Sequence, residues 1–402
     1  MLYLDYTQAL IKMQGVLVKK VATFSNLCTI DIEMSKKCVI CPNCSAPTSN
    51  VHDYRYQKIK DLQAFGMNVI LNYHKRRYAC KQCGKRFSEP HPFVPKYHRM
   101  TNRLVARIID LLSSERSFTS VARETNVSIS TVIRVFDCVS YGRPNTLPKV
   151  LAIDEFKGNT GTEKYQVILT DPETKKVLDI LPCRKQTYML KYLKQWTILE
   201  RMDVRHFVSD MWLPYTDLAS CLFKNATQVI DRYHFIRQMV WAFERVRKRV
   251  QKKFSKNHRL LFKHSRKLLL KRSSKLNELE KEKLNSILYI SNDMLNAYHL
   301  KELFYKIMDS NNREEAKTAM SEWITLAEGS NNYEYKTCAR TLINWQKGIL
   351  NSFDVPYSNG FTEGCNNKIK VLKRNAYGFR NFNRFRNRIL HMFNAQTSSS
   401  TA

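Results

Sequence analysis

The sequence predicts an α/β core that is interrupted by a large all-α insertion and preceded by a zinc-knuckle domain and a helix-turn-helix. Two close Cys-x-x-Cys pairs lie in the first quarter of the chain, and between residues 147 and 234 short apolar runs that end in acidic residues alternate with helical stretches. From Tyr215 to Glu328 the chain has neither Gly nor Pro, which favours continuous helices. These three observations predict the fold class.

Charge and composition restrict the class of protein. The 402 residues include 67 Lys and Arg and 35 Asp and Glu, so the formal net charge is +32. Such a charge disfavours compaction unless a polyanion neutralises it, so nucleic acid is the leading partner and an enzyme for small neutral metabolites is disfavoured. No apolar run approaches the roughly 20 residues that cross a bilayer. The 11 cysteines, an odd number, do not form a secreted disulfide pattern, so we expect a reducing cytoplasm.

Changes in composition along the chain suggest seven parts. Short strand fragments are expected in the first part, at Val16–Val18 and Val21–Phe24. The expected parts are a lead-in (1–37), a zinc-binding domain (38–98), a helix-turn-helix DNA-binding domain (99–146), the first part of the core (147–234), the helical insertion (235–355), the last core helix with a basic segment (356–395) and a disordered tail (396–402).

Two cysteine pairs have the spacing of zinc knuckles. Cys41 and Cys44 form one Cys-x-x-Cys pair, and Cys80 and Cys83 form the other. Two such pairs can hold one tetrahedral Zn²⁺, and because four thiolates leave no open position the ion is expected to be structural. Cys38 is a competing ligand three residues before Cys41, although the Pro-Asn turn suits the knuckle at Cys41 better. The alternative is a set of buried, reduced cysteines.

Residues 101–140 have the pattern of a helix-turn-helix. A first helix within Arg116–Asn126 is followed by a tight turn, and a second helix is expected from Ile129 to about Cys138. The alternative is a helical hairpin that serves as a linker. The residues expected to face outward and contact phosphates and base edges are Ser130, Thr131 and Arg134.

Five expected strands then follow in the order β-β-β-α-β-α-β-α, which is that of an RNase H-like sheet. In such a sheet Asp154, in the first strand, and Asp210, at the end of the fourth, lie on neighbouring strands. Two carboxylates that close together repel each other, and a divalent cation relieves the repulsion. Taken singly, each acid would be an ordinary strand-end or helix-capping aspartate. The expected strands are Lys149–Phe156, Tyr165–Thr170, Lys176–Leu181, Val204–Asp210 and Thr227–Asp231.

A third acidic residue, Glu363, lies in a basic helical stretch near the C-terminus. It shares one helical face with Asn367, Lys370 and Arg374, whereas the apolar residues of the stretch lie on another face. This arrangement suits a helix that places one acid on a metal ion while its later turns follow a phosphate backbone. The alternative is a solvated charged face.

The predicted insertion begins with a strongly basic segment. Between residues 236 and 275 there are fifteen Lys and Arg and one acid, Glu244. So one-sided a charge favours DNA nearby, and the alternative is a solvated helix surface. Trp241 and Phe243 are expected in the core of the helices rather than stacked on bases. The arginines expected to contact DNA are Arg245, Arg247 and Arg249.

The chain resembles, over nearly its whole length, the transposases of the ISL3 insertion-sequence family, which are DDE enzymes with an RNase H-like core. The motifs that carry the resemblance occur in the family's order. They are the paired knuckles with Arg76–Cys80, the helix-turn-helix, Ile153–Phe156, Val208–Met211, Asp231–Phe235 and Asn359–Lys370.

The resemblance implies that Asp154, Asp210 and Glu363 bind the catalytic metal ions. It also implies that Asp231 and His234 form the Asp-x-x-His signature of related transposases, which we expect to brace the core. The implied protein is a DNA transposase that binds the terminal inverted repeats of its own element, with two Mg²⁺ ions at the catalytic site and one structural Zn²⁺. We expect a homodimer or higher homo-oligomer on DNA, in the bacterial cytoplasm and associated with the nucleoid.

Two other functions remain open from the sequence. A sequence-specific DNA-binding regulator would keep the knuckles and the helix-turn-helix but would have no use for three converging acids. A nuclease of the same fold would cut DNA without joining it. Incubation of the protein with Mg²⁺ and a labelled element end separates binding alone, nicking alone, and nicking followed by strand transfer.

Overall fold

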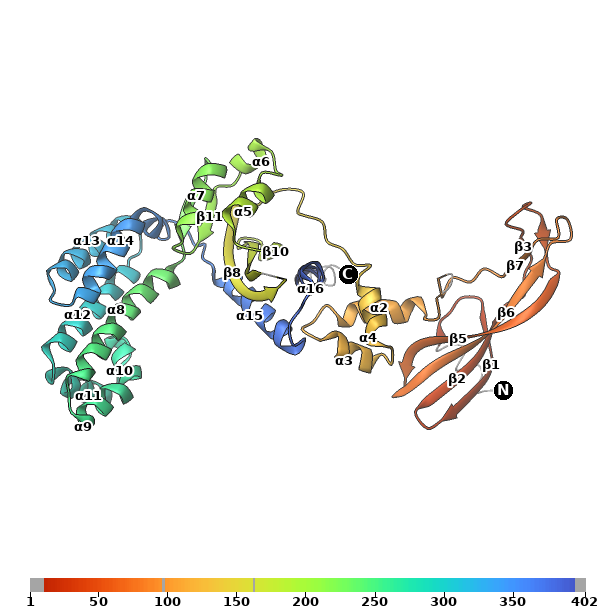
Figure 1. Cartoon of the computed structure of the whole chain (residues 1–402), viewed down its shortest axis with the longest axis horizontal. Helices are drawn as coiled ribbons and strands as arrows, with labels where there is room; N and C mark the ends of the chain where they lie inside the picture. Colours follow the sequence, from red (N-terminus) through yellow and green to blue (C-terminus); the bar gives the residue numbers. More distant parts are fainter. Residues whose placement is uncertain (1–10, 96–97, 162, 395–402) are drawn as a thin grey trace. The chain divides into compact units, whose positions relative to one another are not determined.

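The computed structural model of the chain describes residues 11–95, 98–161 and 163–394 (Figure 1). These residues form two compact units. The first contains the described chain up to Tyr141, together with Val371–Gly378 and the described residues from Asn387. The second contains Gly142–Lys370 and Phe379–Arg386. The predicted tail, 396–402, lies outside the described residues.

The first unit is built on a five-stranded sheet. Its strands are β1 (Val16–Phe24), β2 (Leu27–Met34), β5 (Val51–Ala64), β6 (Met67–Ala79) and β7 (Arg86–Ser88). Their order is β1-β2-β6-β5, and β7 pairs with the far end of β6. The described residues of the expected lead-in, 11–37, therefore contain two full strands of this sheet rather than the short strand fragments that their sequence suggested. Every second residue of β2 is buried, so this segment supplies one face of the same apolar core as β5 and β6.

Three short helices follow the sheet. They are α2 (Asn102–Leu111), α3 (Phe118–Glu124) and α4 (Ile129–Phe136). Each begins after a Thr or Ser whose side chain accepts a hydrogen bond from a backbone N–H three residues later, which is the usual N-cap arrangement. Asn126 turns the chain between α3 and α4 with a φ of 50°, a left-handed conformation that Asn tolerates. The predicted helix-turn-helix is confirmed, with a second helix that ends at Phe136.

The second unit contains a mixed five-stranded sheet. Its strands are β8 (Val150–Thr160), β9 (Glu163–Asp171), β10 (Lys176–Leu181), β11 (His206–Ser209) and β12 (Thr227–Ile230). Their order is β10-β9-β8-β11-β12. The pairs β8–β9 and β9–β10 are antiparallel, whereas β11 is parallel to both β8 and β12. All five strands expected from the sequence are present.

Both faces of this sheet are covered. On one face Leu151 and Ile153 pack in a cluster with residues of the helices α5 (Gln186–Leu193) and α7 (Leu213–Leu222). The short helix α6 (Ile198–Met202) precedes β11. On the other face Val150 and Ala152 pack with residues of β11 and β12. All four of these β8 residues are buried, and successive residues belong to the clusters on opposite faces of the sheet.

Seven α-helices lie between β12 and the last two helices (Figure 1, green to blue). They bury one large apolar core that includes Phe243, Phe262 and Trp323. None of the helices in the described ranges is both long and apolar enough to span a membrane. The helices are α8 (Arg232–Lys252), α9 (Lys256–His264), α10 (Arg266–Leu270), α11 (Glu278–Tyr289), α12 (Asn292–Met308), α13 (Arg313–Gly329) and α14 (Tyr333–Asn351), with a 3₁₀ turn at Ser273–Lys275.

The chain ends in α15 (Gly360–Asn375) and α16 (Phe382–Asn394). Arg388, in α16, is buried and donates hydrogen bonds to the backbone carbonyls of Leu112, Ser114 and Arg116, just beyond the end of α2. These bonds satisfy carbonyls that a helix end leaves without partners. They account for a difference from the predicted division: part of the segment 356–395 belongs to the unit that carries the helix-turn-helix.

Candidate active site and binding surfaces

Three aspartates lie at one edge of the mixed sheet. β8, β11 and β12 are parallel, with Val208 paired to Ala152 and Ser209 paired to Ile230. Asp154 comes two residues after Ala152, Asp210 directly follows β11 and Asp231 directly follows β12. The carboxyl ends of parallel strands meet at the same edge, which is where open α/β sheets bind ligands. Strand order alone therefore brings these three acids to one place.

Asp154 is held by two hydrogen bonds. Its Oδ1 accepts from the backbone N–H of Glu155 over 2.7 Å, and its Oδ2 accepts from Asn366 Nδ2 over 2.8 Å. Burial, together with the nearby carboxylates of Glu155, Glu363 and Asp231, raises the pKa of Asp154 to about 6. Because Glu363 affects this pKa, α15 places the Glu363 carboxylate close enough to Asp154 in β8 for the two charges to interact.

Asp210 lies among the same charges. Burial, together with the carboxylates of Glu155 and Asp154, raises the pKa of Asp210 to about 7. Its Oδ1 is buried and has no hydrogen-bond partner in the described part of the chain. A carboxylate that is buried, short of a donor and next to another carboxylate is a suitable ligand for a divalent cation.

Glu363 forms a close group with the Asp-x-x-His residues. One ligand atom from each of Asp231, His234 and Glu363 lies within 4.8 Å of the other two. Within the described ranges, Asp154 and Asp210 are not members of a metal-ligating group this tight. Asp231 Oδ1 accepts a hydrogen bond from the backbone N–H of Asn359, which ties the end of β12 to the start of α15. Asp231 and His234, the residues of the Asp-x-x-His signature, thus lie next to Glu363 as well as against the core.

His234 is held as a neutral imidazole. Arg237 Nη2 donates to His234 Nδ1 over 3.1 Å, and burial, together with this arginine, lowers the pKa of His234 to about 4. Because Nδ1 accepts this bond, the ring carries its proton on Nε2. In this arrangement Nδ1 of the imidazole is occupied by Arg237.

Glu155, next to Asp154 in the sequence, has a different environment. Its Oε1 forms an ion pair with Arg184 at 2.7 Å, and its Oε2 accepts a hydrogen bond from the Tyr215 hydroxyl. Both of its oxygens are therefore already paired within the protein. The pairing with a cationic side chain distinguishes Glu155 from Asp154, whose hydrogen bonds come from uncharged N–H donors, and from Asp210, whose Oδ1 has no partner among the described residues.

Helix α15 presents the two faces that its sequence predicted. Cys365, Ile369 and Leu372 are buried. On another face, Glu363 is followed by three exposed polar or basic residues. These are Asn367, Lys370 and Arg374.

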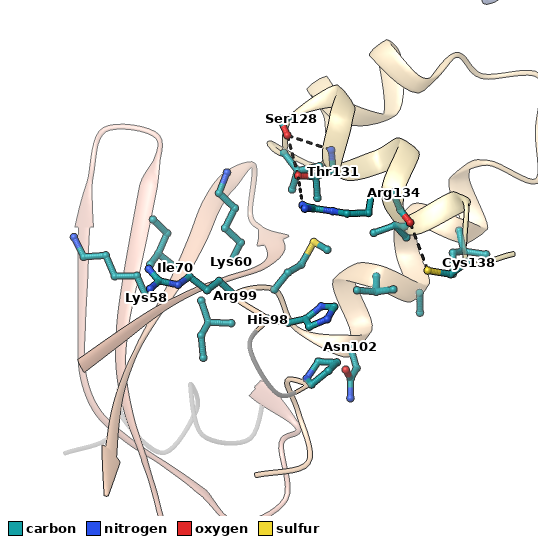
Figure 2. Close-up of a pocket in the computed structure, with 18 residues that line it drawn as sticks. Lys58, Lys60, Ile70, His98, Arg99, Asn102, Ser128, Thr131, Arg134 and Cys138 are labelled. Carbon is teal, nitrogen blue, oxygen red and sulfur yellow. Dashed lines mark hydrogen bonds between the residues drawn. The ribbon is translucent and has the colours of Figure 1, made fainter. Parts of the chain in front are cut away.

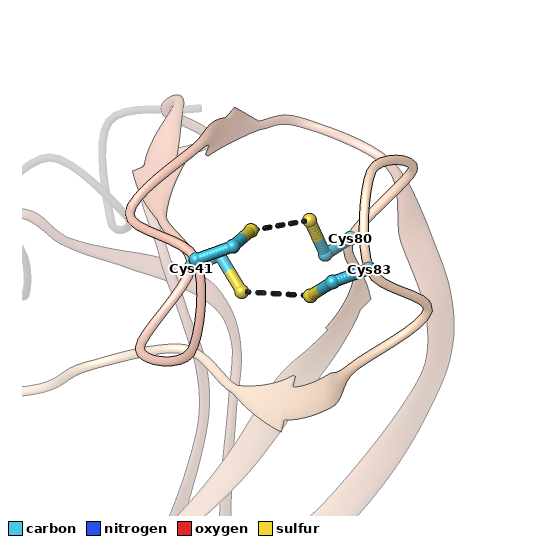
Figure 3. A group of neighbouring side chains, drawn as sticks. Cys41, Cys80 and Cys83 are labelled. Carbon is cyan, nitrogen blue, oxygen red and sulfur yellow. Dashed lines mark hydrogen bonds between the residues drawn. The ribbon is translucent and has the colours of Figure 1, made fainter.

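The two cysteine pairs face each other across a small gap (Figure 3). Cys41 Sγ lies 3.6 Å from Cys83 Sγ, and Cys44 Sγ lies 3.5 Å from Cys80 Sγ. The first knuckle sits between the short strands β3 (Val39–Ile40) and β4 (Pro47–Thr48), and the second between β6 and β7. All four thiols fall within 4.8 Å of one another, as the ligands of one Zn²⁺ must. The predicted tetrad is confirmed, and Cys38 is exposed and outside it.

The knuckles repeat one backbone pattern. In the first, the N–H of Ser45 donates to the carbonyl of Cys41, and in the second the N–H of Gly84 donates to the carbonyl of Cys80, each over 3.0 Å. Both Ser45 and Gly84 have positive φ, 57° and 71°. The turns that place each pair of sulfurs are thus equivalent.

A hollow of about 1060 Å³ separates β5 from the helix-turn-helix (Figure 2). Thr131 and Arg134 line it from α4, and Arg134 and the neighbouring Ser130 are exposed. Lys58 and Lys60 line it from β5. Lys60 Nζ also donates to the carbonyl of Asn126 over 2.6 Å, which joins the sheet to the turn. The hollow is thus basic on both sides.

The same face of β5 continues away from the hollow with aromatic side chains. Tyr54 and Tyr56 are 48% and 76% exposed, and both stack on His74 of β6 with ring centres 4.5 and 4.6 Å apart. Since alternate residues of a strand share a face, Tyr54, Tyr56, Lys58 and Lys60 form one exposed row. Sequence reasoning missed this row, although its alternation was visible in residues 52–60.

Two of the three arginines expected to contact DNA instead form ion pairs with acidic residues of the protein. Arg247 is buried and forms an ion pair with Glu244 at 2.8 Å. Arg249 pairs with Glu334 and Asp293 at 2.8 and 2.9 Å. The structure therefore does not support DNA contacts for these two: Arg247 is neutralised from within α8, and Arg249 by acids of α12 and α14. Arg245 is exposed.

The expectation for the two aromatic residues of this helix is half right. Phe243 is buried in the core of the helices, but Trp241 is 45% exposed. The two side chains differ by two residues and therefore point to different sides of α8.

Comparisons with known proteins agree with these features. Residues 151–389 match a family described as "Transposase", of ISL3 type. Residues 89–138 match the helix-turn-helix domain of transposase family ISL3, and residues 38–83 match the zinc finger of the transposases of IS204, IS1001, IS1096 and IS1165.

Two curated proteins are similar in sequence. The transposase for insertion sequence element IS1001 of Bordetella parapertussis is 27% identical over 359 residues, which are 88% of each chain. A protein named ATP-dependent protease from Lactococcus lactis subsp. lactis is 38% identical over 94 residues, which are 23% of this chain and 29% of that protein. The first similarity extends over nearly the whole length, and the family match covers more than half of the chain. The protein is a DNA transposase that belongs to the ISL3 family.

Proposed function

We propose that this transposase cleaves and joins DNA strands at an RNase H-like centre formed by Asp154, Asp210 and Glu363. In this proposal the three carboxylates hold two Mg²⁺ ions, which when bound activate water and stabilise the leaving 3′ oxygen. Carboxylate oxygens are the ligands that Mg²⁺ prefers. The buried Asp210 Oδ1, which has no hydrogen-bond partner among the described residues, fits this role.

The observation that carries the proposal is the mutual influence of acids from distant segments. Glu363 raises the pKa of Asp154, and Asp154 raises the pKa of Asp210, so all three belong to one electrostatic cluster. Such a cluster costs stability unless a cation neutralises it. Asn366 holds Asp154 in place, and Asp231 holds the start of α15, so that Glu363 remains at the same edge.

The RNase H-like assignment is supported by topology. The sheet order β10-β9-β8-β11-β12, with β9 antiparallel to the other four strands, is the arrangement expected of that fold. The seven α-helices between β12 and α15 then correspond to an all-α insertion before the third acid. Asp231 and His234 brace the core next to Glu363 rather than replace one of the three acids.

We further propose that the first unit recognises the terminal inverted repeats of the element. The N-terminal part of α4 would enter the major groove with Ser130, Thr131 and Arg134. Lys58 and Arg99, both exposed and both lining the hollow beside α4, would hold the adjacent phosphates. The exposed Asn367, Lys370 and Arg374 of α15, together with Arg245, would contact the backbone near the cleavage site.

Because an element has two ends, we expect at least a dimer of the protein on DNA, in the cytoplasm beside the nucleoid. The test is incubation of the purified protein with Mg²⁺, a labelled duplex that carries the inverted repeat flanking the gene, and a target plasmid. We expect a nick that exposes a 3′-OH, followed by joining of the labelled strand to the plasmid. Binding without a nick would instead favour a regulator, and a nick without joining would favour a nuclease.

A further inference from the structure

Four side chains form a stripe along the first half of α8, in which Tyr233, Trp241 and Arg245 are exposed and Arg237 is partly buried. Tyr233, Arg237, Trp241 and Arg245 follow one another every four residues, so they lie one above another on one side of the helix. Tyr233 is 53% exposed and Trp241 is 45% exposed. We call these four residues the α8 stripe. Aromatic rings alternate with arginines over a length of about 18 Å.

Arg237 lies between the two rings. Its guanidinium carbon is 5.5 Å from the centre of the Tyr233 ring and 4.8 Å from that of Trp241. One cation thus contacts two aromatic side chains and fixes their spacing. Arg237 Nε is buried and has no hydrogen-bond partner in the described ranges. The stripe is therefore ordered by the protein while about half of each aromatic side chain stays accessible.

The stripe does not contribute to the apolar core of the helices. The residues of α8 that fill this core, among them Phe235, Met239 and Phe243, are buried on another side of the helix. An exposed tryptophan and tyrosine leave apolar surface in water, which is unfavourable. Large exposed aromatic residues next to arginines are typical of surfaces that bind a partner.

The stripe begins at the candidate active site. The Tyr233 ring packs edge-on against the His234 ring, with centres 5.6 Å apart, and His234 lies in the group with Asp231 and Glu363. Burial raises the pKa of both Asp210 and Glu363, and the nearby charge of Arg237 offsets part of that rise. A ligand on the stripe would therefore lie beside the acids of the cleavage site.

We propose that the α8 stripe binds unpaired nucleotides of a DNA strand end, with bases stacked on Tyr233 and Trp241 and phosphates paired with Arg237 and Arg245. The inference rests on the proposed function in taking DNA as the substrate. Every base has a π-face, so such stacking tolerates any sequence, and the arginines supply the charge that a phosphate requires. Duplex DNA offers no free base face along its length, which is why the site selects an unpaired strand.

The test compares two DNA ligands in EDTA, so that no cleavage is needed. One is a duplex element end with an unpaired extension of about five nucleotides, and the other is the same duplex with a blunt end. We expect the wild-type protein to bind the extended duplex more tightly, and Trp241→Ala to lose roughly 5- to 150-fold in affinity for it, the effect of one stacked base. Binding of the blunt duplex, which depends on the first unit, should be nearly unchanged.

Three further variants make the result specific. Trp241→Phe should retain most of the affinity for the extended duplex, whereas Trp241→Leu, which keeps an apolar side chain without a ring, should lose as much as Trp241→Ala. Tyr289→Ala removes an aromatic residue that is 93% exposed elsewhere in the same unit and should have no effect. Circular dichroism and the Tm of each variant verify folding.

Two results would overturn the proposal. An equal loss on both duplexes would assign the stripe to the backbone of paired DNA, and no loss for Trp241→Ala or Trp241→Leu would make it a surface feature of the helix alone. Failure of the wild-type protein to cleave DNA in Mg²⁺ would count against the proposed function and would leave this binding result unaffected.

Discussion

Asn366 Nδ2 donates a hydrogen bond of 2.8 Å to Asp154 Oδ2, across 212 residues of sequence. The bond joins α15 to β8 at the point where Glu363, one turn earlier on α15, raises the pKa of Asp154. A neutral amide donor can hold an aspartate in its charged form without occupying the site with a cation. Asn366 is thus a positioning residue for the first acid.

We expect Asn366→Ala to reduce strand cleavage by about 10- to 100-fold, the effect of one hydrogen bond to a charged group. Affinity for element ends should stay within twofold of wild type, because the binding surfaces lie in other segments. Single-turnover cleavage and a gel-shift titration measure the two quantities. Asn344→Ala, at an exposed position of α14, is the matched control and should cleave nearly normally. Equal activity of the two variants would contradict the positioning role.

The second prediction concerns pH. Burial raises the pKa of Asp210 from 3.8 to about 7, so the folded protein binds a proton there more tightly than the unfolded chain does. The stability that this proton gives is fully present below the ordinary pKa and is lost as the pH rises through the folded value. We therefore expect the Tm in EDTA to fall between pH 4 and pH 7.

Asp210→Asn should raise the Tm in EDTA by a few degrees at pH 8 and have little effect at pH 4, because it removes a buried charge only where that charge exists. Added Mg²⁺ should raise the Tm of the wild-type protein at pH 8 but not that of the variant. Differential scanning calorimetry measures both effects. A variant that is less stable than wild type at pH 8 would show that Asp210 is favourably paired in the metal-free protein.

The third prediction concerns zinc. Metal analysis of the purified protein should give one Zn²⁺ per chain, and Cys83→Ser should lower this content and weaken binding to element ends. Cys38→Ser is the matched control, since Cys38 is exposed and lies outside the group of four thiols. A full zinc content in Cys83→Ser, or its loss in Cys38→Ser, would identify a different ligand set.

The fourth prediction separates arginines that stabilise the helices from an arginine that contacts DNA. Arg247→Ala breaks a buried ion pair with Glu244 and should lower the free energy of unfolding by about 3–5 kcal/mol. Arg245→Gln should leave stability nearly unchanged and reduce the slope of log affinity against log salt by about one unit. Arg249→Gln, which removes a side chain paired with Glu334, should keep the salt slope of wild type. If the slopes of Arg245→Gln and Arg249→Gln were equal, the exposed position would have no special role.

Local patterns in the sequence were sufficient to predict the structure of several parts of the molecule. The spacing of the cysteines predicted the tetrad at Cys41, Cys44, Cys80 and Cys83 because a Cys-x-x-Cys turn fixes where both sulfurs point. Short apolar runs, three of which end at or near an acid, predicted the five strands of the mixed sheet. The apolar stripe of α15, with Cys365 and Ile369 buried, followed from helical periodicity.

Features that depend on tertiary contacts were not predictable in this way. The charge of residues 236–275 suggested a DNA-binding face, but Glu334 and Asp293, which neutralise Arg249, belong to other helices. The sequence pattern predicted only short fragments of β1 and did not predict β2, because β2 reaches its core only through parallel pairing with β6. The role of Asn366 could not be inferred either, since Asp154 is distant in sequence.

The most direct test of the account is strand cleavage of a labelled element end by Asp154→Asn, Asp210→Asn and Glu363→Gln in Mg²⁺. Each change keeps the shape of the side chain and removes its charge, so we expect each to abolish cleavage and leave end binding nearly intact. Glu155→Gln and Asp171→Asn are the acidic controls and should remain active. If Asp231→Asn abolished cleavage and Asp210→Asn did not, the second acid would be misassigned. Cleavage by all three of the first variants would contradict the proposed mechanism.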